Sequence, residues 1–172
     1  MSRRITRNEI LEAHAHYESS TQLYTPTKVY SDTLAVVYKR LAEEWGVVVT
    51  WSDCLTYGAS VKDWPAFKDS VEALQYLKHH FVLVVLSNID NTNFVHSNKK
   101  LNVVFDAVYT AEDIGSYKPS QVNFDYMIEN LERLGIEKTE ILHTAESMFH
   151  DHAPANHCGL SNCWIYRRHG QE

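Results

Sequence analysis

The sequence contains no long apolar run. No stretch approaches the roughly 20 consecutive apolar residues that a membrane-spanning helix needs. The opening segment, MSRRITRNEILEAHAHYESS, lacks the apolar core of a secretory signal, and its early acids Glu9 and Glu12 argue against a transit peptide. We therefore expect no membrane partner and a cytoplasmic location.

Cysteine and net positive charge are also scarce. The three cysteines, Cys54, Cys158 and Cys163, show no C-x-x-C spacing, and such an odd, sparse count favours a reduced cytosolic protein over a disulfide scaffold. Asp and Glu (22) outnumber Lys and Arg (16), and the resulting charge of −6 would repel a phosphate backbone. We therefore expect no nucleic-acid partner.

Histidine, by contrast, is concentrated in the segment HTAESMFHDHAPANH at residues 143–157. His150 and His152 are separated by one residue, so on a helix they would point about 200° apart. The chain also contains no cysteine pair and no H-E-x-x-H motif that could complete a tetrahedral ligand set. We therefore expect no structural zinc site in this segment.

The first third of the chain has the apolar periodicity of helices. With 172 residues, 44% of them hydrophobic, the chain is large enough for one full core. Thr6 or Asn8 can cap the first helix and Ser52 the third. The expected helices span residues 6–19, 25–46 and 51–61.

From Pro65 onward, helices alternate with strands. The run FVLVVLS at residues 81–87 is continuously apolar and rich in β-branched residues, which indicates a strand buried on both faces, as in a parallel sheet. We predict a helical region at 1–63 and a doubly wound α/β region with a parallel sheet at 64–172. The other expected strands span 105–112, 140–146 and 161–167, and the expected helices span 68–80, 91–101, 119–135 and 150–159.

Polar clusters follow three of the predicted strands. Ligands of doubly wound folds sit at the carboxyl ends of the strands, where Ser87 and Asn88, then Lys118, then the loop of Glu146 and Asp151 occur. A hydroxyl, an amide and an ammonium group can bind an anion, and the acids can hold a cation or orient the lysine. The alternatives are a turn at Ser87, a solvated Lys118 and acids that cap a helix.

In their order and spacing, these clusters resemble the haloacid dehalogenase (HAD) superfamily. The resemblance rests on LSN after an apolar strand, on SYKPS with Phe124 behind it, and on ILHTAESMFHDHAPANHCGLSNCWIYRR. The last block is most similar to the type II 2-haloacid dehalogenase-like branch. The resemblance covers about residues 65–168 and implies a Rossmann-like core, and the helical region 1–63 is similar in character to the cap of these enzymes.

The resemblance implies roles for individual residues. Ser87, assisted by Asn88, would hydrogen-bond the nucleophile's carboxylate or the substrate's anionic group. Lys118 would balance the negative charge, and Asp151 would hold Lys118 or a water molecule. These four residues are the expected catalytic set, and Ser87, Asn88, Lys118 and Ser147 are the expected substrate-binding set.

The resemblance also bears on cofactors. Dehalogenases of this type need no metal, so none is expected. The alternative is a Mg²⁺-dependent phosphatase of the same superfamily, in which Glu146 and Asp151 would hold the metal. The sequence AES, in place of the usual double-acid loop, disfavours that alternative.

The chain departs from the family at the nucleophile. The superfamily carries an aspartate in a D-x-D-x-T or D-x-x-G-T motif on its first strand, and no aspartate of this sequence has that setting. We interpret the chain as a truncated dehalogenase-like hydrolase that is inactive as written, whose full-length form would take a small anionic substrate. A non-catalytic binding or regulatory domain is the alternative, and a sheet edge exposed by the missing strand would favour homo-oligomers.

Overall fold

The computed structural model describes residues 4–167 and groups the chain into two compact units, which we call unit 1 (Met1–Gly115) and unit 2 (Ser116–Glu172). The units are described separately. The predicted boundary between a cap-like region and an α/β core at residues 63–64 stays a prediction.

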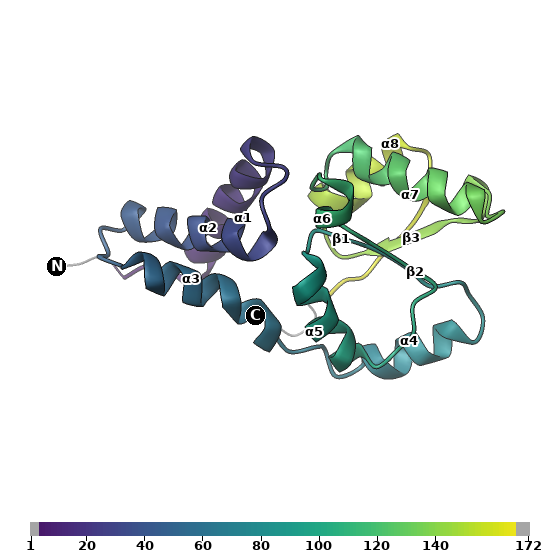
Figure 1. The fold of residues 1–172 in the computed structure, drawn as a ribbon, viewed down its shortest axis with the longest axis horizontal. Helices are drawn as coiled ribbons and strands as arrows, with labels where there is room; N and C mark the ends of the chain where they lie inside the picture. The colour runs from purple at the N-terminus through teal and green to yellow at the C-terminus, as the bar shows by residue number, and fades with distance from the viewer. Residues whose placement is uncertain (1–3, 168–172) are drawn as a thin grey trace. The chain divides into compact units, whose positions relative to one another are not determined.

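Unit 1 begins with three helices, which confirms the periodicity of the first third (Figure 1). Thr6 caps the first helix in a capping box with Glu9, as one of the two predicted caps. Thr50 caps the third helix in a box with Asp53, so the prediction of Ser52 as the cap was wrong by two residues. The helices are α1 (Arg7–Tyr24), α2 (Tyr30–Glu44) and α3 (Trp51–Ala59).

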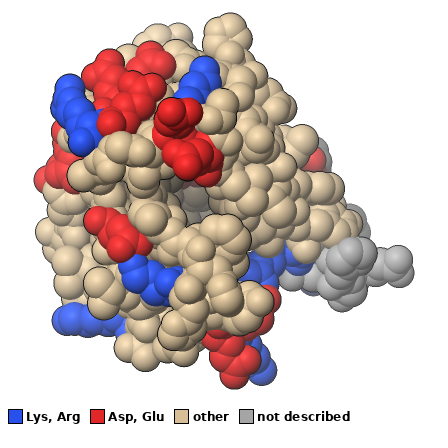
Figure 2. Space-filling view, turned by 90° about the vertical axis from the view of Figure 1, so that its right-hand side faces the viewer, with Lys and Arg blue, Asp and Glu red and all other residues tan. Residues whose placement is uncertain are grey.

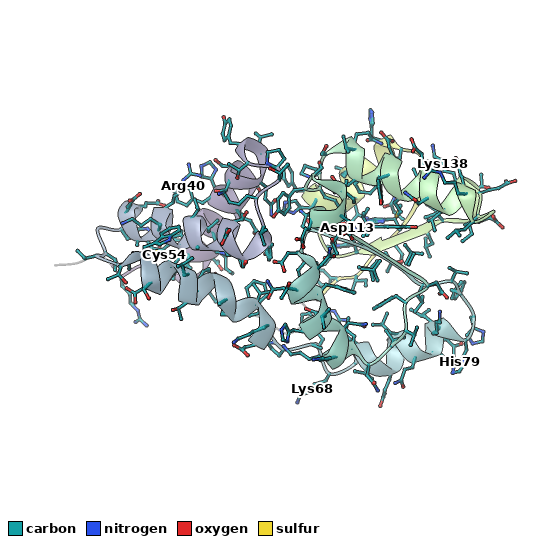
Figure 3. The ribbon with its side chains drawn as sticks, in the orientation of Figure 1. Arg40, Cys54, Lys68, His79, Asp113 and Lys138 are labelled. Atoms are coloured by element: carbon teal, nitrogen blue, oxygen red, sulfur yellow. The ribbon has the colours of Figure 1, made fainter. Side chains whose placement is uncertain are left out.

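Helices α2 and α3 pack at very short range. Leu34 and Val37 of α2 are fully buried, as is Cys54 of α3, which is labelled in Figure 3. A Cβ atom built on Gly58 would lie 2.1 Å from the backbone oxygen of Ser31, so only glycine permits this approach of the two backbones.

The remainder of unit 1 contains one parallel pair of strands and the helices next to it (Figure 1). Strands β1 (Val84–Ser87) and β2 (Ala107–Thr110) pair in register from Val84 with Ala107 to Ser87 with Thr110. The other elements are the 3₁₀ turn η1 (Ser60–Asp63), α4 (Ser70–Lys78), α5 (Asn91–Leu101) and the short α6 (Ala111–Ile114).

Strand β1 is shorter and less buried than predicted. All four of its residues are half-buried, and Phe81 and Val82, which we expected inside it, are exposed. The backbone N–H of Leu83 donates to a carboxylate oxygen of Asp106 at 2.7 Å. This N–H is therefore bonded to a side chain, where we expected a bond to the backbone of a neighbouring strand. A continuous apolar run therefore located the strand correctly but overestimated its length and burial.

Unit 2 contains a second parallel pair of strands. Strands β3 (Leu142–Ala145) and β4 (Ser161–Trp164) pair from Leu142 with Ser161 to Ala145 with Trp164. Phe124, Met127 and Leu131 line the buried face of the long helix of this unit. Its helices are α7 (Gln121–Arg133), the 3₁₀ turn η2 (Lys138–Glu140), the π-helical turn η3 (Met148–His152) and α8 (Ala153–His157).

The fold class is thus the predicted α/β class with parallel strands. The strands form two two-stranded sheets, β1–β2 and β3–β4, where we predicted a single doubly wound sheet. Each predicted strand is present, and each is four residues long.

The surface charge is mixed. On the face shown in Figure 2, acidic and basic side chains lie interspersed among uncharged residues, without a continuous basic area. None of the helices in residues 4–167 is both long and apolar enough to cross a membrane.

Candidate functional site

A buried ion pair joins two of the predicted site residues. The ammonium nitrogen Nζ of Lys118 lies 2.5 Å from Oδ1 of Asp151, and each side chain is about one-tenth exposed. Lys118 precedes α7, and Asp151 lies in η3, so the two segments are 33 positions apart in the chain. Two desolvated charges need such short contact, because an unpaired charge at this depth would cost several kcal/mol. The solvated-lysine alternative is therefore excluded.

A third side chain reaches the same carboxylate oxygen. Nε2 of His143 lies 3.1 Å from Oδ1 of Asp151, and the histidine is also about one-tenth exposed. His143 comes from the middle of β3, and its ring packs edge-on against Phe124 of α7, with the ring centroids 5.4 Å apart. Lys118, Asp151 and His143 therefore form one buried cluster, which we call the charged centre.

Two opposed effects set the protonation of Asp151. Burial raises the pKa of its carboxyl group, whereas the hydrogen bond from His143 and the positive charge of Lys118 lower it. The lowering effects prevail, so the pKa of Asp151 lies below its ordinary value. Asp151 is consequently ionised at neutral pH, and it holds the ammonium group of Lys118 in place.

The π-helical turn η3 is fastened at both ends. At its start, the backbone N–H of His150 donates to Oγ of Ser147 at 3.0 Å. At its end, the ring nitrogens of His152 lie 2.9 Å from the carbonyl oxygen of Ala145 and 3.2 Å from Oδ1 of Asn162. These contacts tie the turn to β3 and β4 and fix the direction of Asp151. Single turns of π-helix occur often at functional sites.

The predicted magnesium ligands do not fit a cation. Oδ1 of Asp151 faces Nε2 of His143 and the ammonium group of Lys118, whose positive charge would repel a divalent ion. The other proposed ligand, Glu146, has an exposed side chain, and its backbone oxygen accepts from Nε1 of Trp164 at 2.9 Å. Within the described residues, no three His, Cys, Asp or Glu side chains gather as metal ligands.

The remaining predicted residues, Ser87 and Asn88, lie in unit 1. Ser87 is the last residue of β1, Asn88 follows it, and both are half-buried. Their places at the end of a parallel strand agree with the prediction. That they act together with Lys118 stays a prediction, as does the substrate-binding role of Ser147.

The loop after β1 is clamped to the end of β2 by a residue that sequence reasoning missed. Oδ1 of Asn91 accepts from the Thr110 hydroxyl at 2.8 Å, and its Nδ2 donates to Oδ1 of Asp113 at 2.7 Å (Asp113 is labelled in Figure 3). The backbone N–H of Asn91 donates to a carboxylate oxygen of Glu112 at 2.7 Å. Asn91, the first residue of α5, therefore ties the loop after β1, which contains Asn88, to the residues that follow β2.

His143 is the other residue of the candidate site that sequence reasoning missed, because the histidines of this segment were considered only as zinc ligands. The strand pattern contained a usable signal. In EILHTAE, alternation places Ile141, His143 and Ala145 on one face, so a titratable side chain shares the inward face with apolar ones. A buried histidine needs a polar partner, and the predicted acids of the following loop were Glu146 and Asp151.

Comparison with known proteins identifies the family. Residues 6–165 match the family of haloacid dehalogenase-like hydrolases. No curated protein sequence matches the chain significantly. Solved structures with the same fold include the L-2-haloacid dehalogenase from Xanthobacter autotrophicus, with a TM-score of 0.79 and 17% identity over 96% of this chain and 68% of the enzyme. They also include the HAD-hydrolase YfnB from Bacillus subtilis, bound to magnesium, with a TM-score of 0.75 and 14% identity over 94% and 74%.

At these identities the structural neighbours establish the fold, and the family match establishes the lineage. The match spans the helices of unit 1 as well as the charged centre of unit 2, so it covers nearly the whole chain. The chain belongs to the haloacid dehalogenase-like hydrolases.

Proposed function

We propose that the charged centre belongs to a small-carboxylate site of the 2-haloacid dehalogenase type. The observation that carries the proposal is the buried Lys118–Asp151 pair, which keeps an ammonium group in place within a largely desolvated environment. Charge–charge interactions are stronger in a desolvated environment than in water, and an ammonium group is a charge-assisted donor to a carboxylate. The match to the dehalogenase-like family and the dehalogenase folds among the structural neighbours support the same substrate class.

In the proposed reaction, an aspartate carboxylate attacks the carbon that bears the halogen, and the carbon–halide bond breaks as the ester forms. Water then cleaves the ester, which releases the 2-hydroxy acid and a proton and restores the carboxylate. Lys118 would hold the substrate anion, and Asp151 would hold Lys118 and support the attack of water.

The sequence contains no D-x-D-x-T or D-x-x-G-T motif to supply the nucleophile. We therefore expect this chain to bind a 2-halocarboxylate without releasing halide. The test is calorimetric titration with 2-chloropropionate, together with an assay for released chloride. Lys118→Met should weaken binding at least tenfold, whereas Lys138→Met, at an exposed lysine of the same unit, should leave binding unchanged. Lys118→Arg keeps the charge and should retain part of the affinity.

Other results of these binding and release assays would support a different function. Equal binding by wild type and Lys118→Met would contradict the anion site. Chloride release that Lys118→Ala abolishes would show that an unrecognised aspartate acts as the nucleophile. Phosphate release from an aryl phosphate that depends on Mg²⁺ would favour the phosphatase alternative.

The non-catalytic alternative rests on the same missing motif and makes its own prediction. A domain retained for binding, with an exposed sheet edge, should associate with itself. Size-exclusion chromatography with light scattering would show a dimer or a larger species. A monomer across a hundredfold range of concentration would contradict the proposed homo-oligomer and leave the carboxylate site unaffected.

A further inference from the structure

The Asp151 carboxylate receives two donors on one oxygen. Nζ of Lys118 and Nε2 of His143 both approach Oδ1, at 2.5 and 3.1 Å, from two different segments of unit 2. An ordinary ion pair needs only one of these contacts. The second contact comes from a histidine on the inward face of β3, at a position where an apolar residue would fill the space more simply.

The geometry fixes where the histidine carries its hydrogen. An ionised carboxylate offers only acceptors, so the contact is a hydrogen bond only if Nε2 of His143 is protonated. Both the neutral Nε2–H form and the imidazolium form satisfy this condition. The charged or titratable groups around the ring are Lys118, which precedes α7, and Asp151 and His152 of η3. The ring of His152 lies edge-on to that of His143, with the ring centroids 6.3 Å apart.

We propose that His143 is a positioning residue of the charged centre, which keeps Asp151 oriented and ionised while the Lys118 ammonium group engages an anion. An anion at Lys118 draws part of the lysine's charge away from Asp151. A carboxylate at this depth that lost its only donor would tend to take up a proton or turn away. The donor from His143 comes from a paired strand, so it stays in place when Lys118 adjusts. This role rests on the proposed function, but its test requires neither substrate nor turnover.

The test uses the full chain labelled with ¹⁵N and ¹³C, as wild type, His143→Gln and His143→Leu. Gln can place an amide N–H near the position of Nε2, whereas Leu fills the space without a donor. The imidazole spectrum of the wild type should show His143 protonated at Nε2 and hydrogen-bonded. In a titration of the Asp151 carboxyl signal, His143→Leu should raise the midpoint by about one pH unit, since a lost hydrogen bond of this kind is worth about a factor of ten in the equilibrium. His143→Gln should keep the midpoint within a few tenths of a unit of wild type.

Two results would overturn the role of His143. One is a wild-type His143 that carries its only hydrogen on Nδ1. The other is an equal shift of the Asp151 midpoint in both variants, which would mean that the histidine only fills space. If His143→Leu does not fold, two measurements still test the role of His143: the tautomer of His143 in the wild type and the titration midpoint of Asp151 in His143→Gln. Failure of 2-chloropropionate binding would count against the proposed function and leave these measurements intact.

Discussion

At the scale of single residues, the strongest energetic consequence concerns the buried Lys118–Asp151 pair. Removal of one member leaves the other as an uncompensated buried charge, which costs about 3–5 kcal/mol. We expect Lys118→Met and Asp151→Leu each to lower the free energy of unfolding by about that amount. The double variant should lose much less than the sum, because no unpaired charge remains.

Chemical denaturation of the four proteins in this cycle measures the coupling. Lys138→Met is the control, since this lysine is exposed and its loss should change stability by less than about 0.5 kcal/mol. Strictly additive losses in the double variant would show that the two charges do not depend on each other.

A second consequence at this scale is the response to acid. The pKa of Asp151 in the folded protein lies below its ordinary value of about 3.9, so in acid the unfolded chain binds this proton first. The contribution of the ionised Asp151 carboxylate to the free energy of unfolding is therefore fully present above the ordinary pKa. It is lost as the pH falls through the lower pKa of the folded state. The free energy of unfolding should fall more steeply below about pH 4 in wild type than in Asp151→Asn. Denaturant titrations from pH 6 to pH 3 compare the slopes, and equal slopes would contradict the lowered pKa.

The site was predictable from sequence to different extents at different residues. Lys118 and Asp151 were recognised by their places after predicted strands, and the structure brings them together. His143 was not recognised, because a histidine in a histidine-rich segment resembles a solvated one until its strand face is considered. Asn91 was not recognised either, because its contacts to Thr110 and Asp113 depend on which two strand ends are neighbours.

At the scale of elements, the contact between α2 and α3 depends on one glycine. In an exposed helix position, Gly→Ala would add about 1 kcal/mol of stability. In α3, the added Cβ of Gly58→Ala would lie 2.1 Å from the Ser31 backbone oxygen, so the helices must separate. We expect a net loss of about 1–3 kcal/mol in the free energy of unfolding.

Thr56→Ala provides the matched control in the same helix, because Thr56 is exposed and bonds only within its own helix. This change should alter stability by less than about 0.5 kcal/mol. A Gly58→Ala variant that is as stable as wild type, or more stable, would show that the two helices do not need the close approach.

The clamp between the loop after β1 and the end of β2 makes another prediction at this scale. Asn91→Ala removes the acceptor of the fully buried Thr110 hydroxyl, and a buried polar group without its partner costs about 1–3 kcal/mol. Amide hydrogen exchange should accelerate at residues 88–94 and remain unchanged in α7. Asn130→Ala, which removes a bond only within α7, should not affect residues 88–94. Protection of the loop equal to that of wild type would exclude the clamp.

The positions of the helices were predicted well where apolar periodicity, capping residues or helix-breaking residues gave a strong signal. Helix α5 has the predicted bounds, and α1, α2 and α7 lie where apolar spacing placed them. The π-helical turn η3 had no sequence signature, because an i to i+5 turn shows no period distinct from that of an α-helix over five residues. The division of the strands into two sheets also lay beyond prediction, since periodicity assigns strands but not their partners.

At the scale of the whole molecule, the resemblance to the family was recognised from the order and spacing of the polar clusters that follow the predicted strands. Identities of 14–19% to the solved structures leave little direct sequence similarity, yet the fold agrees over more than nine-tenths of this chain. What agrees at such distance is the α/β fold itself.

The most direct measurement is an NMR titration of the ¹⁵N-labelled chain with 2-chloropropionate at low ionic strength. If the charged centre binds the carboxylate, the largest saturable shifts will fall on Lys118, His143 and Asp151, and they will vanish in Lys118→Met but persist in Lys138→Met. Saturable shifts confined to other parts of the chain, or shifts at these residues that survive the loss of Lys118, would contradict a carboxylate site at the charged centre.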